Sequence, residues 1–112
     1  MNNAQDFGLH VTENGQEPVL LLKGDLDLAS APELRARLGE LAGENVTLDF
    51  SEVTFMDSTA VGVLVAAHDR SVLAGKRIRI HGVQPGQLRL FELMGLLDHM
   101  DLDGQEAGPT QP

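Results

Sequence analysis

The chain of 112 residues contains no cysteine, tryptophan or tyrosine. Without cysteine it forms no disulfide or thiolate metal site and has no thiol nucleophile. Its aromatic residues are 4 phenylalanines, so we expect no surface on which nucleic-acid bases stack. The longest run of apolar residues and glycine, 60–67, is far shorter than the ~20 residues that span a bilayer as a helix. The first six residues lack the pattern of a signal peptide, and together these absences favour a cytoplasmic protein.

Positive charge is also scarce. The chain has 8 basic and 17 acidic side chains, which give a net charge of −9. Such a chain repels nucleic acid and anionic lipid unless it carries a strong basic patch. The densest basic stretch is Lys76–Arg79, which is too short to form one. We therefore expect neither nucleic acid nor a membrane among its partners.

Motifs of common enzyme classes are missing. There is no Gly-x-Ser-x-Gly segment, and Gly75-Lys76 is followed by Arg77 rather than by the hydroxyl residue of a phosphate-binding loop. The carboxylates show no pairing typical of acid–base catalysis. The four histidines are scattered without metal-ligand spacing: His10, His68, His81 and His99. We expect a protein that is not an enzyme, with no cofactor and no metal.

What is present is the pattern of a small α/β domain, since 42% of the residues are hydrophobic. Alternating or continuous apolar runs predict strands, and helical spacing of leucines and valines predicts helices. The order is β-β-α-β-α-β-α, which favours a mixed sheet of four to five strands with helices packed on it. The predicted strands are 7–12, 19–22, 46–50 and 77–81, and the predicted helices are 30–43, 57–74 and 85–95.

Local signals place the ends of these elements. Asn14-Gly15 favours a hairpin between the first two strands. The all-apolar run Val19–Leu22 is typical of a strand covered on both faces, and Gly24–Asp27 should end it. Ser30–Glu33 resembles a capping box, and residues 51–57 should form a loop. We expect residues 1–100 to form one domain and residues 101–112 a mobile acidic tail.

The first candidate for a functional role is the hydroxyl of Ser58. It lies at the start of a strongly apolar helix, where unpaired amide groups and the helix dipole favour an anion. The alternative is that Asp57 or Ser58 is simply the N-cap of this helix, because residues of these types are common caps. A second candidate is Gly24–Asp27, which alone indicates only a turn. It gains meaning if strands two and three are neighbours, because their carboxyl ends then share one edge of the sheet.

Four segments of the chain resemble STAS domains, and more closely bacterial anti-sigma factor antagonists. The likeness covers nearly all of residues 7–100. The matching segments are Gly24–Asp27, Val46–Phe50, Phe55–Thr59 and Leu90–Leu96. The resemblance implies a small mixed sheet with helices.

This resemblance also implies a function. In such proteins the dephosphorylated form binds an anti-sigma factor, usually a serine kinase of the histidine-kinase-like ATPase class, and releases a sigma factor. The kinase phosphorylates the serine after the aspartate, here Ser58, and a serine phosphatase reverses this. The implied contact residues are Asp25, Asp27, Met56, Asp57, Ser58 and Thr59. Many relatives have glycine where this chain has Ala60, which would alter how closely a kinase approaches.

Two alternatives remain. STAS-like domains also serve as cytosolic subunits of ABC-type lipid transporters, and such subunits carry a similar Asp-Ser helix start. A nucleotide-binding protein with weak hydrolysis is disfavoured by the missing phosphate-binding loop.

Overall fold

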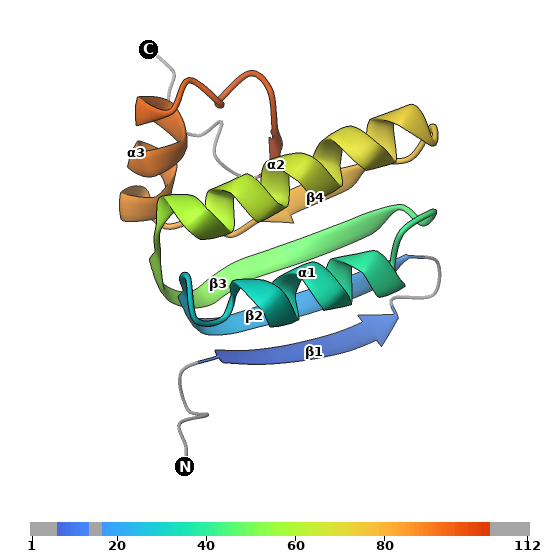
Figure 1. The fold of residues 1–112 in the computed structure, drawn as a ribbon, viewed down its shortest axis with the longest axis horizontal. Helices are drawn as coiled ribbons and strands as arrows, with labels where there is room; N and C mark the ends of the chain where they lie inside the picture. The colour runs from blue at the N-terminus through green and yellow to red at the C-terminus, as the bar shows by residue number, and fades with distance from the viewer. Residues whose placement is uncertain (1–6, 14–16, 104–112) are drawn as a thin grey trace.

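Five strands form a single sheet in the order β1-β2-β3-β4-β5 (Figure 1). The structure, a computed structural model, describes residues 7–13 and 17–103. β1 is antiparallel to β2, and the other neighbouring pairs are parallel, which confirms the expected mixed sheet. Within these residues, none of the helices has the length and apolar character needed to cross a membrane. The elements are β1 (Phe7–Glu13), β2 (Pro18–Leu26), α1 (Ala31–Glu40), β3 (Val46–Met56), α2 (Ser58–Leu73), β4 (Ile78–His81), α3 (Pro85–Leu93) and β5 (Asp101–Asp103).

The hydrophobic core lies on one face of the sheet. Figure 1 shows α1 and α2 side by side across that face, with α3 at the end of the sheet. Alternate residues of the central strands are buried there, whereas their neighbours Val19, Leu21 and Thr47 are only half-buried. The expectation that Val19–Leu22 is covered on both faces is therefore wrong, because both long helices pack on the same side. The buried strand residues include Leu20, Leu22, Leu48, Phe50, Ile78 and Ile80.

β2 and β3 both run further than their sequences indicate. β2 continues through Gly24 to Leu26, and β3 continues through the expected loop 51–57 as far as Met56. The two strands pair in parallel over this extension, with Leu26 opposite Met56. Two register shifts interrupt the ladder, and such irregularities break the alternation on which strand prediction rests.

The starts of the helices were only partly predictable. α2 begins directly after Asp57 and α3 begins at Pro85, as expected. The capping box predicted at Ser30 is wrong: its side chain makes no capping bond to α1. Its Oγ accepts the amide of Asp27 at 2.9 Å and donates to the carbonyl of Asp25 at 2.9 Å. The carboxylate of Asp27 closes the turn before α1 by accepting the amides of Ala29 and Ser30.

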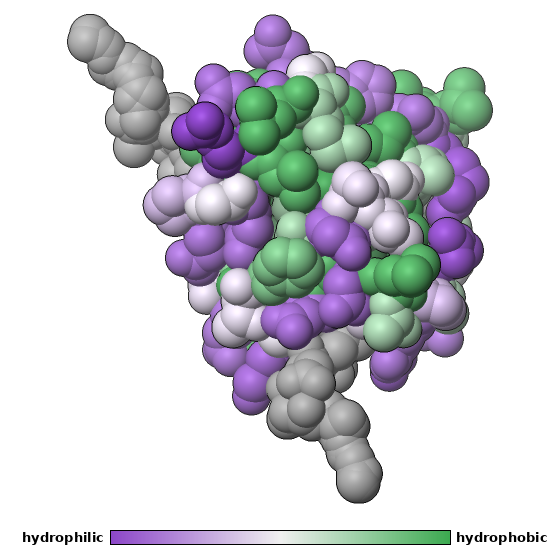
Figure 2. All heavy atoms as spheres, turned by 60° about the vertical axis from the view of Figure 1, so that its left-hand side comes forward, coloured by the Kyte–Doolittle hydropathy of each residue, from purple (hydrophilic) through white to green (hydrophobic). Residues whose placement is uncertain are grey.

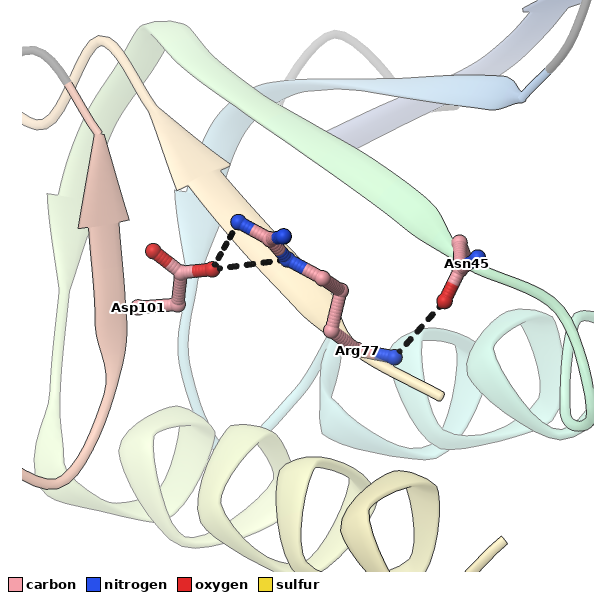
Figure 3. Close-up of polar contacts among 3 residues, drawn as sticks. All are labelled: Asn45, Arg77 and Asp101. Atoms are coloured by element: carbon pink, nitrogen blue, oxygen red, sulfur yellow. Dashed lines mark hydrogen bonds and ion pairs between the residues drawn. The ribbon is translucent and has the colours of Figure 1, made fainter. Parts of the chain in front are cut away.

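The prediction of a mobile tail from residue 101 is wrong for its first three residues, because Asp101–Asp103 form β5 beside β4. Arg77 contributes to this pairing (Figure 3): its Nε and Nη2 lie 3.2 and 3.0 Å from Oδ2 of Asp101. The amide of Arg77 donates to Oδ1 of Asn45, which ties the starts of β3 and β4 together. Met100 is buried and Leu102 packs against the core. Residues 104–112 and the turn expected at Asn14-Gly15 lie outside the described residues.

Gln87 anchors α3 to the sheet. Its side chain is buried, and its Nε2 donates to the carbonyl of Val53 in β3 at 3.0 Å. Its Oε1 accepts the amide of Gln84 at 3.0 Å. One side chain thus satisfies a strand carbonyl and a helix-start amide at once, which positions α3 against β3.

We predict that Gln87→Leu lowers the free energy of unfolding by about 1–3 kcal/mol, because two polar backbone groups lose their partner. Urea denaturation, monitored by circular dichroism, measures this change in the free energy of unfolding. Glu92→Gln, on the exposed side of the same helix, is the control and should stay within about 0.5 kcal/mol of the parent. Equal stabilities of the two variants would contradict the anchoring role.

Candidate functional site

The carboxyl ends of β2 and β3 meet at one edge of the sheet. Leu26 pairs with Met56, and the amide of Asp57 donates to the carbonyl of Leu26 at 3.0 Å. The two segments singled out in the sequence, Gly24–Asp27 and Met56–Thr59, therefore lie side by side, as expected for neighbouring parallel strands. This edge also contains the start of α2, on the left of Figure 1.

Asp57 links the two segments through its carboxylate. Its Oδ1 accepts the amide of Ala60 at 3.1 Å, and its Oδ2 accepts the amide of Leu28 at 3.2 Å. Its extended backbone (φ −112°, ψ 178°) is that of an N-cap. Of the two alternatives for the cap, the structure assigns Asp57, so Ser58 is the first residue of the helix and its hydroxyl is not needed for capping.

Ser58 is exposed, Thr59 is half-buried, and the next two residues are fully buried. The amide groups of the first helical residues have no partner within a helix, and the dipole adds partial positive charge there. The hydroxyl of Ser58 therefore stands at the surface beside groups that favour an anion. The methyl of Ala60 packs in the core, so it does not obstruct an approaching protein.

The carboxylates of Asp25 and Asp27 both accept hydrogen bonds at this edge. Oδ1 of Asp25 accepts the hydroxyl of Thr54 at 2.8 Å, and the carboxylate of Asp27 closes the turn described above. Both side chains remain partly exposed. With Asp57 they give this edge a negative charge next to Ser58.

Met56, by contrast, is only 6% exposed and belongs to the core. Its neighbour Phe55 is 53% exposed, and Leu28, in the turn that Asp57 holds, is 71% exposed. Neither was predicted as a contact residue. The face of Phe55 cannot be read from alternation because a register shift lies beside it, and Leu28 lies in a turn after β2, where no periodicity applies. Figure 2, in which this side comes forward, shows apolar patches among hydrophilic side chains.

A separate cluster was also missed. The sequence shows no metal-ligand spacing among the histidines, yet folding places His68, Asp69 and His99 next to one another. His68 and Asp69 are on α2, and His99 lies between α3 and β5. Their separation along the chain, 30 residues between Asp69 and His99, hides the cluster from any search for short motifs.

Comparison with known proteins places these features in a family. The family model "Mlab, STAS domain" matches residues 9–102. The Anti-sigma-B factor antagonist of Bacillus subtilis (strain 168) is 29% identical over 108 residues, which cover 95% of this chain and 99% of that protein.

Solved structures share the fold. An anti-sigma factor antagonist from Mycobacterium paratuberculosis superposes with a TM-score of 0.81 at 19% identity, covering 96% of this chain and 93% of that one. Unphosphorylated SpoIIAA gives a TM-score of 0.71 at 21% identity, covering 89% and 91%. Bacillus SpoIIAA in its phosphorylated form gives 0.67 at 22% identity, covering 89% and 95%. The mixed sheet, the Asp57-capped helix and the match over residues 9–102 lead to one conclusion: this chain belongs to the STAS domain family.

Proposed function

We propose that this protein is an anti-sigma factor antagonist whose binding is controlled by phosphorylation of Ser58. In its dephosphorylated form it binds an anti-sigma factor serine kinase, which then releases a sigma factor. The observation that carries this proposal is the exposed hydroxyl of Ser58 at the first turn of α2, beside a turn that Asp57 ties to it. The names of the curated relatives support the same class of function.

The site favours phosphorylation without refolding. Ser58 is exposed, so a kinase can reach it, and its neighbours Ala60 and Val61 keep the helix start anchored in the core. A phosphoserine carries about −1.5 to −2 charge at neutral pH, and helix amides offset part of it within the protein. The fold thus tolerates the modified side chain.

A phosphate on Ser58 would, by contrast, disfavour a bound partner. In the complex the phosphate would be desolvated against a surface that fits a neutral hydroxyl, in a neighbourhood that already contains Asp25, Asp27 and Asp57. Like-charge contact or burial of a charge costs several kcal/mol at an interface. Because each ~1.4 kcal/mol changes affinity tenfold, two such steps weaken binding about a hundredfold. Charge alone is sufficient for the switch.

Apolar contact supplies the rest of the proposed interface. Phe55 and Leu28 expose large apolar surfaces at the edge that carries Ser58, and exposed aromatic residues are typical anchors of protein interfaces. In this proposal Phe55 and Leu28 take the contact role that the sequence suggested for Met56, whose side chain is buried.

We predict that a candidate anti-sigma factor kinase, incubated with this protein and ATP, transfers one phosphate to Ser58. Intact-mass and peptide mass spectrometry locate the modification. Ser58→Ala should abolish it, whereas Thr59→Ala, the adjacent hydroxyl, should not. Modification confined to Thr59 would overturn the site assignment.

We predict opposite effects on kinase binding for two substitutions of Ser58. Ser58→Ala should bind as tightly as the dephosphorylated parent and remain bound in the presence of ATP, because it cannot be modified. Ser58→Asp, which adds one negative charge, should bind at least tenfold more weakly. Isothermal titration calorimetry measures both, and parent-like affinity of Ser58→Asp would contradict the charge mechanism.

We predict that Phe55→Ala weakens binding of the same kinase at least tenfold, because an exposed aromatic anchor is lost. Its thermal stability should change little, since the side chain is half in solvent. Leu73→Ala, at the opposite end of α2 and 89% exposed, is the matched control and should bind like the parent. Equal losses in both variants would argue against an interface at this edge.

Affinity purification of the tagged chain tests the alternative role as a STAS subunit of an ABC-type lipid transporter. Recovery of a soluble serine kinase supports the proposal, and recovery of a membrane-bound ATPase supports the alternative. The curated relatives favour the first outcome, because the matches are named as anti-sigma-B factor antagonists.

A further inference from the structure

We propose that His68, Asp69 and His99 form a binding site for a divalent transition metal, with Zn²⁺ the best fit. One ligand atom from each residue lies within 4.8 Å of the others. Nε2 of His99 is 2.9 Å from Oδ1 of Asp69, and the two imidazole rings meet edge to face with centroids 5.2 Å apart. Two imidazoles and one carboxylate thus converge from two separate segments of the chain.

The state of His68 is the second observation. A histidine with a purely structural role normally has its ring nitrogens hydrogen-bonded. In the part of the chain that the structure describes, Nδ1 of His68 is buried and has no hydrogen-bond partner. Leaving such a group unsatisfied destabilises the fold, so the ring is not explained as a stabilising core residue. This nitrogen has a free lone pair or N–H, and the ring already lies against that of His99 in the cluster.

The donor set selects the class of metal. Neutral imidazole and carboxylate are ordinary ligands of Zn²⁺, whereas Ca²⁺ and Mg²⁺ prefer oxygen ligands alone. Bonds of about 2.0–2.1 Å in a tetrahedral site place neighbouring ligand atoms roughly 3.4 Å apart. The present ligand atoms lie within 4.8 Å of one another, and the side chains of Asp69 and His99, 54% and 44% exposed, have room to rotate toward a metal.

The surroundings complete the site. Asp98 lines the same surface hollow, along with Val72 and Leu73, and the hollow is open to water, which can supply the fourth ligand. Three protein ligands and a water are the usual set in open zinc sites. The carboxylates of Asp69 and Asp98 bring negative charge to the hollow, which attracts a cation.

The position of the cluster gives the metal a structural consequence. His68 lies ten residues after Ser58 on α2, about 15 Å along the helix, so the cluster is separate from the proposed switch. His99 belongs to the segment between α3 and β5. A bound metal would therefore tie the segment that leads into β5 to the second half of α2.

Titration of the full chain with ZnCl₂ near neutral pH, followed by calorimetry, tests the site. We expect one Zn²⁺ per chain, and at least tenfold weaker binding for each of His68→Gln, Asp69→Asn and His99→Gln. His81→Gln, a histidine on β4 outside the cluster, is the control and should bind like the parent. Replacing Zn²⁺ by Co²⁺ should give the visible absorption of a tetrahedral site, and this absorption should be lost in His99→Gln.

Thermal unfolding provides a readout that does not depend on the heat of binding. Zn²⁺ should raise the melting temperature of the parent and of His81→Gln, because a ligand that binds only the folded state stabilises it. Zn²⁺ should not raise the melting temperature of His99→Gln. Because residue 99 is exposed, circular dichroism of this variant without metal should match that of the parent. Absence of binding, or binding that persists in the His68→Gln/His99→Gln double variant, would overturn the proposal. Either result leaves phosphorylation of Ser58 unaffected.

Discussion

The carboxylate of Asp57 is the contact on which the candidate site depends. One oxygen caps α2 at Ala60, and the other holds the turn after β2 at Leu28. Its backbone amide adds a third bond, to Leu26. Two segments separated by 29 residues are thereby held in one arrangement. A helix cap of this kind contributes about 0.5–2 kcal/mol, but here it also determines where Ser58 and Leu28 stand relative to each other.

The residues that stabilise the fold lie apart from the candidate site. α1 and α2 cover one face of the sheet, and the buried residues of the strands pack beneath them. The edge formed by the carboxyl ends of β2 and β3 contributes little to that core beyond Leu26 and Met56. In the proposed switch, a change of charge at Ser58 therefore acts on the surface offered to a partner and leaves the packing intact. This arrangement suits a protein whose regulation works through association rather than through refolding.

Much of the fold was predictable because its signals are local. The cap at Asp57, the apolar first turns of α2, and the glycines that follow each helix act over a few residues. The errors fall where distant pairing overrides local preference. Gly24 and Asp25 are typical turn residues, yet strand pairing with Val53 and Phe55 keeps them in β2. Likewise Asp101–Asp103 looks like an acidic tail, but β4 and the guanidinium of Arg77 hold it as a strand.

The sequence by itself determined the class of fold, the order of the elements as far as α3 and the position of Ser58 at a helix start, since periodicity and capping need only neighbouring residues. Only the tertiary structure decided which side chains reach the surface at that start: Phe55 is exposed and Met56 is buried, because two register shifts reset the alternation between β2 and β3. Only the tertiary structure, too, brought His99 to His68 and Asp69. Contacts between residues so far apart arise from the packing of whole elements, which no short stretch of sequence encodes.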